Sequence, residues 1–384
     1  GMKVVAYTDV IQVAVLIIGG LVTSYIALTT VGHYFGYGDD AFAGFKVLMR
    51  EAPEHFKMII PEPTAASSQN DINKYLTFPG LMSYLAGIWI INLNYWGCNQ
   101  YITQRALGAD LQTARTGILF AGMLKLLMPV IVMLPGIAAY VLYENGHLPQ
   151  LVGGKDGAYS AMLTFLPTGL KGLSVAALTA AIVASLAGKV NSISTIYTLD
   201  VHKKYIQKNA TDRAQVNIGR YAVFAAMLLA VMFTWNDLLG IGGVGGFTYI
   251  QKYTGFISPG VFAMFFLGMF WKRTTGTAAI VGVIAGFLLS VLFNEFAPAL
   301  FGNETLLYTA WPNGHGGYEI PFHICMGLSF VFTMLLMIGI SFAGPKVNPK
   351  AFELDTEMFK IKPQTTVMIV LTLVIIAALY VKFW

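Results

Sequence analysis

The sequence predicts an all-α polytopic membrane protein with about nine transmembrane helices. The chain is 56% hydrophobic and only 11% charged, whereas an ordinary soluble domain is about 25% charged. Its apolar residues lie in runs of roughly 20 residues or more, the length that an α-helix needs to cross a bilayer. These runs are too long and continuous for the strands of a membrane barrel, so helices are the expected spanning form.

Each predicted span is an apolar run that polar segments separate from the next. The nine spans are 9–33, 78–104, 114–143, 170–200, 214–236, 247–271, 276–297, 321–343 and 365–383. A short helix outside the membrane is expected at 158–166.

The distribution of Lys and Arg predicts the orientation of the chain. If the N-terminus is cytoplasmic, the inner loops hold 13 basic residues and the outer loops hold six, and the loop 298–320 holds none. Because basic residues accumulate in cytoplasmic loops, we expect the N-terminus inside and the C-terminus outside. Dispersed positive charge of this kind indicates a lipid bilayer as the partner and argues against nucleic acid.

The sequence shows no motif that is typical of a soluble enzyme. The two cysteines, Cys98 and Cys325, make neither a disulfide framework nor a metal-ligand spacing. The six histidines are scattered, and no nucleophile with a neighbouring base stands out. The run "GIGGVGG" at 240–246 formally contains GxGxxG, but no βαβ unit surrounds it. We therefore expect a flexible turn there and no enzyme activity.

The segment 88–105, "IWIINLNYWGCNQYITQR", mixes amides and aromatic rings within spanning length. Buried amides are costly in hydrocarbon unless they are hydrogen-bonded. Asn92, Tyr95, Trp96 and Asn99 suit a polyhydroxylated ligand, because amides bind hydroxyl groups and rings stack on the apolar faces of sugars. The alternative is that these amides join neighbouring helices.

Two further spans carry polar or helix-breaking residues. Lys125 lies about ten residues into its span, near the midplane, and an intramembrane lysine is by default a functional-site hypothesis. The alternative is that its side chain snorkels to the interface. In "YIQKYTGFISPG" (249–260), Gln251 precedes Ser258-Pro259-Gly260. Transporters build sites from helices broken in this way, and tight packing is the alternative.

The segment "LTAAIVASLAGKVNSIST" (178–195) carries a stripe of small residues on one helical face. Its members are Ala181, Ala184, Ser185, Gly188 and Ser192. Such a stripe either lets another backbone approach closely or presents carbonyl and hydroxyl oxygens to a hard cation. Lys189 lies about 85° from the centre of the stripe, given 3.6 residues per turn.

Five stretches of the sequence resemble the sodium/solute symporter family, and its bacterial sodium–glucose/galactose cotransporter branch above all. They are "TDVIQ" (8–12), "NYWGCNQYITQR" (94–105), "LKLLMPVIVMLPGIAAY" (124–140), "AAIVASLAGKVNSISTIYTLD" (180–200) and "YIQKYTGFISPG" (249–260). The resemblance is specific over residues 1–275, and the last 110 residues resemble the family only as three further spans.

The resemblance implies a partial LeuT-like inverted-repeat transporter fold, cut short at its N-terminus by about five spans. It divides the chain into the last helix of the first repeat (1–34), an extracellular loop (35–77), the second repeat of five helices (78–275) and three peripheral helices (276–384). We expect that these residues alone do not transport, because the repeat interface needs both repeats.

The resemblance also assigns roles to individual residues. In the sugar branch, the residues that match Asn92, Lys125 and Gln251 hydrogen-bond the sugar, and the tyrosine at Tyr95 caps the site beside Trp96. The coupling ion is Na⁺, held by the carbonyl at Ala181 and by two serines. Only the second serine is present here, as Ser185, because Ala184 replaces the first.

The residue that matches Asp9 lies near the exit route of the ion. Lys189 either belongs to the ion site or, as we expect, reaches the inward cavity or the interface.

The predicted function is sodium-coupled uptake of a glucose- or galactose-type sugar across the bacterial inner membrane by alternating access. Three alternatives stay open. They are a family symporter for an amino acid, vitamin or anion, a sodium-independent or proton-coupled carrier, and a non-transporting scaffold or sensor subunit.

Overall fold

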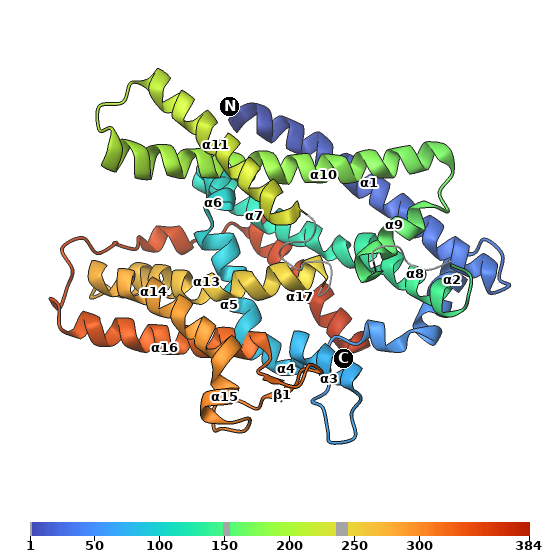
Figure 1. The fold of residues 1–384 in the computed structure, drawn as a ribbon. Helices are drawn as coiled ribbons and strands as arrows, with labels where there is room; N and C mark the ends of the chain where they lie inside the picture. The colour runs from blue at the N-terminus through green and yellow to red at the C-terminus, as the bar shows by residue number, and fades with distance from the viewer. Residues whose placement is uncertain (1, 149–153, 236–244) are drawn as a thin grey trace. The chain divides into compact units, whose positions relative to one another are not determined.

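The computed structural model describes residues 2–148, 154–235 and 245–384 (Figure 1). In this part of the chain nine helices are long and apolar enough to cross a membrane, as predicted. They are Tyr7–Tyr34, Gln69–Cys98, Leu111–Glu144, Thr168–Ile206, Asp212–Thr234, Gly246–Phe270, Gly276–Phe301, Phe322–Phe342 and Pro363–Phe383. The short helix expected at 158–166 is α9, Ala158–Leu163.

One span differs from its predicted range of 78–104. The helical run begins at Gln69, ends at Cys98 and is interrupted at Asn99, whose backbone is extended. The Asn99 side chain accepts a hydrogen bond from the Tyr101 N–H, and its carbonyl accepts one from the Thr103 N–H. Asparagine is more favourable at the N-cap of a helix than in a helix interior, so a new helix starts here. The glycine run 240–246 lies outside the described residues, apart from Gly245 and Gly246.

The chain divides into two compact units, and residues 1–56 and 104–246 form the first. Its helices are α1 (Met2–Tyr34), α2 (Ala41–Glu51), α7 (Leu111–Leu124), α8 (Leu134–Glu144), α9, α10 (Thr168–Thr195) and α11 (Asp212–Thr234). Short 3₁₀ turns cover Pro53–Phe56, Lys125–Leu127 and Gly154–Gly157, and π-helical segments cover Pro129–Met133 and Ile196–Ile206.

Helix α1 organises the first unit, because it packs along α10 on one side and against α2 and α8 on others (Figure 1). The Thr23 and Ser174 hydroxyls lie 2.9 Å apart across the α1–α10 contact. A Cβ on Gly19 would lie 3.0 Å from the Cβ of Ala177, so the helices meet through small residues. The apolar core where α1, α2 and α8 meet includes Val31, Leu48 and Leu142.

Residues 57–103 and 247–384 form the second unit. Its elements are α3 (Gln69–Thr77), α4 (Gly80–Met82), α5 (Ile88–Leu93), α13 (Gly246–Phe270), α14 (Gly276–Val291), α15 (Ala297–Phe301), β1 (Trp311–Pro312), β2 (Tyr318–Glu319), α16 (Phe322–Phe342) and α17 (Pro363–Phe383). π-Helical segments cover Ser83–Gly87, Asn94–Cys98 and Leu292–Phe296, and a 3₁₀ turn covers Thr356–Phe359. Helix α6 (Gln100–Ala106) crosses the boundary between the units.

Glycines let the helices of the second unit cross closely. A Cβ on Gly286 of α14 would lie 2.5 Å from the Cα of Gly260 on α13. A Cβ on Gly87 would lie 2.4 Å from the carbonyl oxygen of His323 on α16. Helix α13 continues through Pro259 without a break. At Gly260 the structure therefore has tight packing, which was the alternative considered for Ser258-Pro259-Gly260.

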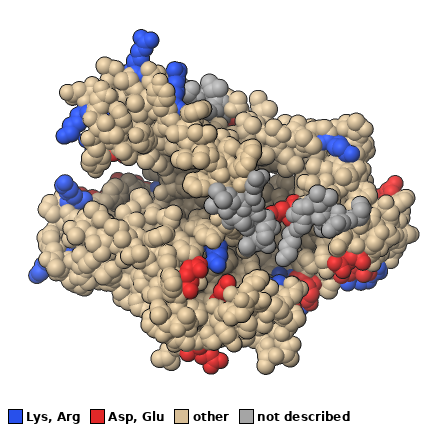
Figure 2. All heavy atoms as spheres, viewed as in Figure 1, with Lys and Arg blue, Asp and Glu red and all other residues tan. Residues whose placement is uncertain are grey.

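Much of the surface of these helices is apolar, as a protein surrounded by lipid requires. None of the apolar window in α17 is buried within the protein, and only 6% of the window in α11 is buried. Figure 2 shows broad areas without charge on the face in view, with the charged side chains in a few small groups. The all-α polytopic fold class is therefore confirmed.

Candidate functional site

The span with mixed amides and rings carries its polar residues at an irregular helical segment. Asn92, on α5, is exposed and donates from Nδ2 to the Ile88 carbonyl at 2.8 Å. The ring of Tyr95 is 37% exposed and stands perpendicular to that of Trp96, with centroids 5.9 Å apart. Both rings lie in the π-helical segment Asn94–Cys98. π-Segments often mark functional sites because they re-aim side chains.

Two other amides of this span have structural partners. Asn94 donates from Nδ2 to the hydroxyl of Ser258 on α13 at 3.1 Å, and its Oδ1 is buried without a partner among the described residues. Asn99 caps α6, as described above. The helix-joining alternative therefore applies to Asn94, while Asn92 keeps its side chain exposed on the same span.

Lys125 lies where helix α7 changes geometry. Pro129 has no N–H to donate to the Lys125 carbonyl, and that carbonyl accepts from the Met128 N–H within a 3₁₀ turn. A π-helical segment follows at Pro129–Met133. The lysine itself is exposed near the middle of the span Leu111–Glu144. A charge at this depth is tolerated when it faces a cavity or a polar partner.

The π-segment after Lys125 is held by a hydroxyl from α1. The Leu134 N–H donates to the Pro129 carbonyl, and Pro135 has no N–H, so the Val130 carbonyl loses its helical donors. The Ser24 hydroxyl lies 2.6 Å from that carbonyl oxygen and 2.9 Å from the Gly20 carbonyl oxygen, and its one proton is donated between the two. Backbone groups freed in a spanning helix need such a replacement. Pro129 and Pro135 are the sequence signal from which this distortion could have been predicted.

Gln251 lies half-buried on α13, one residue before an ion pair. Lys252 Nζ lies 3.9 Å from Glu319 Oε2 on β2, and the other Glu319 oxygen accepts from Asn313 at 3.1 Å. The β1–β2 hairpin pairs Trp311 with Glu319. Glu319 was not identified from the sequence, because only the fold brings it to α13.

The small-residue stripe lies on an unbroken part of α10. Ala181 and Ala184 are half-buried, Ser185 and Lys189 are exposed, and Gly188 and Ser192 are buried. Ala181 and Ser185 are one turn apart, so the Ala181 carbonyl and the Ser185 hydroxyl lie on the same face. A helical carbonyl uses one lone pair in its backbone bond and keeps a second. The stripe therefore has a carbonyl oxygen and a hydroxyl oxygen, the type of atom that hard cations prefer, on one helical face.

An ion pair connects α6 to α1, and two amide contacts connect it to α10, the helix that carries the stripe. Arg105 Nη2 lies 2.8 Å from Asp9 Oδ2 on α1. The adjacent Gln104 accepts from Ser192 at 3.3 Å and donates to Thr195 at 3.5 Å, both on α10. Asp9 was predicted to lie near the ion route, but its pairing with Arg105 was not predicted.

The predicted residues fall into two groups. Asp9, Lys125, Ala181, Ser185 and Lys189 belong to the first unit. Asn92, Tyr95, Trp96, Asn99 and Gln251 belong to the second. In the described residues no three His, Cys, Asp or Glu side chains group in a way that could hold a metal ion.

Apolar spans that carry amides and a lysine near mid-span are typical of membrane transport proteins. The family model described as the sodium:solute symporter family matches residues 1–286. The chain belongs to the sodium:solute symporter family.

Alignments with relatives in the family cover the whole of this chain or most of it. The chain is 37% identical over 400 residues to the sodium/glucose cotransporter of Vibrio parahaemolyticus, covering 100% of this chain and 67% of that protein. It is 33% identical over 307 residues to the sodium/myo-inositol cotransporter 2 of Mus musculus, covering 76% of this chain and 44% of the relative. It therefore spans about two thirds of the first relative and less than half of the second.

A solved structure supports the fold. A sodium-coupled sialic acid symporter in a substrate-bound, outward-open state matches with a TM-score of 0.63 at 16% identity, covering 91% of this chain and 64% of that one. At this identity the likeness confirms the architecture alone, which is the predicted LeuT-like one.

Proposed function

We propose that this chain belongs to a sodium-coupled symporter for a glucose- or galactose-type sugar that works by alternating access. The observation that carries the proposal is Lys125, an exposed lysine near the middle of an apolar span, at a change from α-helical to 3₁₀ geometry. A non-transporting scaffold gains nothing from such a charge, whereas a polar substrate at the midplane offers oxygen atoms that a lysine can bind. The whole-chain similarity to a sodium/glucose cotransporter supports the same function.

In this proposal Asn92, Lys125 and Gln251 hydrogen-bond the hydroxyl groups of the sugar. Tyr95 covers the sugar on the inward side with Trp96 beside it, and Asn99 fixes the start of the next helix. Asn92 and Gln251 are amides that can both donate and accept, which suits hydroxyl groups. Lys125 donates only, so it binds a hydroxyl oxygen.

Sodium, the proposed coupling ion, is held by the Ala181 carbonyl and the Ser185 hydroxyl, together with oxygens from elsewhere in the protein. Sodium is a hard cation that prefers oxygen ligands. Ala184 offers no hydroxyl, so the site has one ligand fewer than the family pattern implies. Asp9 lies on the proposed release route, and sodium binding favours the outward-open state.

The proposed location is the bacterial inner membrane, with the N-terminus inside and the C-terminus outside, because the predicted inner loops carry 13 of the basic residues. The proposed division places the last helix of one repeat at 1–34, the outer loop at 35–77, the second repeat at 78–275 and peripheral helices at 276–384.

A competition panel tests the substrate class. Membrane vesicles that carry the whole protein containing this chain are given labelled galactose with sodium outside. Glucose and galactose are expected to compete, and amino acids, vitamins and organic anions are not. Failure of every hexose to compete would overturn the sugar assignment.

Ala184 favours one second candidate, a carrier whose coupling to sodium is weak or replaced by protons. Replacing sodium with choline distinguishes the two, because a sodium symporter loses uptake and a sodium-independent carrier retains it.

A further inference from the structure

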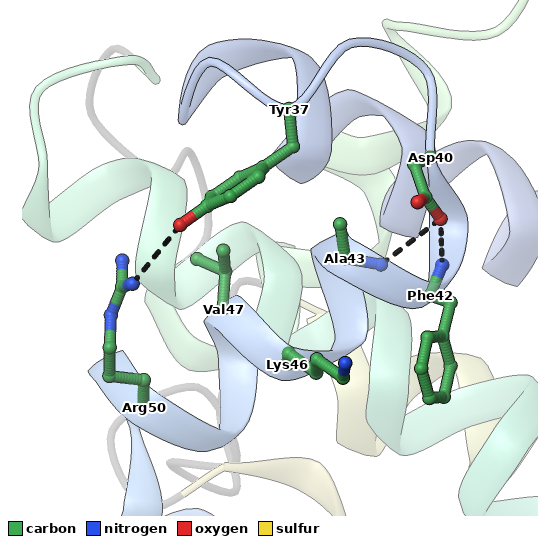
Figure 3. Close-up of a pocket in the computed structure, with 7 residues that line it drawn as sticks. All are labelled: Tyr37, Asp40, Phe42, Ala43, Lys46, Val47 and Arg50. Carbon is green, nitrogen blue, oxygen red and sulfur yellow. Dashed lines mark hydrogen bonds between the residues drawn. The ribbon is translucent and has the colours of Figure 1, made fainter.

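Two charged side chains at the pocket on helix α2 have structural partners of their own. Figure 3 shows the Asp40 carboxylate at the first N–H groups of the helix and Arg50 beside the Tyr37 hydroxyl, 3.5 Å away. These contacts account for both charges without a ligand. Asn94 in the second unit differs, because its Oδ1 is buried and has no partner among the described residues.

Asn94 joins the span of mixed amides and rings to α13 through a buried hydroxyl. Its Nδ2 donates to the Ser258 hydroxyl at 3.1 Å. Ser258 is 1% exposed, and its hydroxyl donates in turn to the Thr254 carbonyl at 2.9 Å. Two hydrogen bonds in series therefore hold Asn94 against the backbone of α13.

This contact is not the one that stability alone would favour. A buried polar atom without a partner, as Asn94 Oδ1 is, costs free energy. An apolar side chain of similar size would avoid that cost, and the Ser258 hydroxyl would still keep its bond to Thr254. Departures of this kind from the most stable arrangement are expected at functional sites.

On the span, Asn94 is the first residue of the π-helical segment Asn94–Cys98, which also holds Tyr95 and Trp96. A π-segment directs its side chains differently from the α-helix that precedes it. Asn92 lies two residues earlier, in the last turn of α5. The contact with α13 therefore holds the part of the span that carries three of the proposed sugar residues.

On α13, Ser258 shares a helical face with Gln251. The helix is continuous from Gly246 to Phe270. Seven positions separate the two residues, which is within about 20° of two full turns and about 10 Å of rise. The face of α13 that carries Gln251 is thus the face that meets the span at Ser258.

An aromatic contact lies beside this hydrogen bond. The ring of Trp89 on α5 stands edge-on to that of Phe262 on α13, with centroids 5.9 Å apart. Apolar packing of this kind holds the two helices together but is not directional, whereas a hydrogen bond is. The bond from Asn94 to Ser258 therefore fixes how the helices are aligned.

We propose that Asn94 and Ser258 are positioning residues for the proposed sugar site. Their hydrogen bond sets the place of Asn92, Tyr95 and Trp96 relative to Gln251. The inference rests on the proposed function and gives neither residue a contact with the sugar. It requires only that a displacement of about 1 Å in binding groups has a large effect.

Sodium-driven galactose uptake by vesicles that carry the whole protein tests the inference, with KM and maximal rate measured separately. Asn94→Leu is expected to raise the KM for galactose about fivefold or more and to change the maximal rate less than about twofold. The unfolding temperature should stay at or above that of wild type, because the change also removes the unpartnered Oδ1. A contact that serves stability alone would lower the unfolding temperature and leave KM unchanged.

Ser258→Ala is expected to raise KM by a similar factor, and it keeps the test decisive if Asn94→Leu does not fold. The double variant should be no worse than the worse single variant, because either change already breaks the bond. Asn294→Leu is the matched control. Asn294 is also half-buried in a π-helical segment, Leu292–Phe296, but its Nδ2 donates to the Ser290 carbonyl of its own helix at 2.8 Å. It should keep the wild-type KM.

The inference is overturned if either single variant keeps the wild-type KM, if the two effects multiply in the double variant, or if Asn294→Leu raises KM as much. Failure of the proposed function has a different signature, because wild type itself would then take up no galactose. In that case the same variants are compared with the solute that the competition panel identifies.

Discussion

Arg105 and Asp9 form an ion pair, with 2.8 Å between Nη2 and Oδ2, that joins helix α6 to α1. Their side chains are 37% and 20% exposed, so water screens the pair only in part. We expect Asp9→Asn to lower the free energy of unfolding by about 1–3 kcal/mol, between the values for surface and buried pairs. Thermal unfolding of the purified protein measures it.

A double-mutant cycle isolates the pair. Arg105→Gln and Asp9→Asn together should destabilise by less than the sum of the single changes, because either change already removes the interaction. Strict additivity would show that the two charges act separately and that the contact contributes nothing.

The close crossing at Gly87 predicts a large effect of a small side chain. A Cβ at this position would lie 2.4 Å from the His323 carbonyl oxygen, which is backbone and cannot move aside. Gly87→Ala should cost about 1–3 kcal/mol of stability. Gly339→Ala on α16 is the control, because nothing lies within 4 Å of its added Cβ. Equal unfolding temperatures for the two variants would refute the crossing.

Ser24 should matter because Pro135 is present. Ser24→Ala leaves the Val130 carbonyl without its 2.6 Å donor and should cost about 1–3 kcal/mol. In a Pro135→Ala background the residue-135 N–H can take over, so the cost of Ser24→Ala should fall. Unfolding of the four proteins of this cycle measures the coupling. The same cost in both backgrounds would contradict the account.

Lys189 is expected to act outside the sodium site. It is exposed on α10, one turn beyond Ser185, which is about 6 Å of rise. Lys189→Met should change the apparent sodium affinity by less than about threefold, because we expect its charge to lie in the inward cavity or at the interface, where water and salt screen it. Sodium titration of sugar uptake measures this, with Lys171→Met on the same helix as the control. A large loss or gain of affinity would place Lys189 in the ion site.

The sequence predicts the spans well because a helix that crosses a bilayer must be long and apolar. Both the length and the apolar composition of such a helix can be recognised in the sequence. The interruption at Asn99 was not predicted. In the sequence Asn99 looks like one more polar residue within a span, whereas in the structure its side chain caps the next helix. Lys125 was proposed from the sequence because a charge in an apolar run stands out, and its role stays a prediction. The 3₁₀ and π segments around Lys125 follow from Pro129 and Pro135, which have no N–H to donate. The structure is needed to show which carbonyl oxygens lose their hydrogen-bond donors.

Ion pairs between residues that are far apart in the sequence could not be predicted. The sequence shows Asp9, Arg105, Lys252 and Glu319 as charges near span ends, but only the fold pairs them.

Coupling of sugar movement to the sodium gradient is the central claim, and an overshoot measurement tests it most directly. Vesicles that carry the whole protein are equilibrated with labelled galactose, and an inward sodium gradient is then imposed. We expect the galactose content to rise above its equilibrium value and then to decay as the gradient dissipates. A content that stays at equilibrium while galactose still exchanges across the membrane would contradict it.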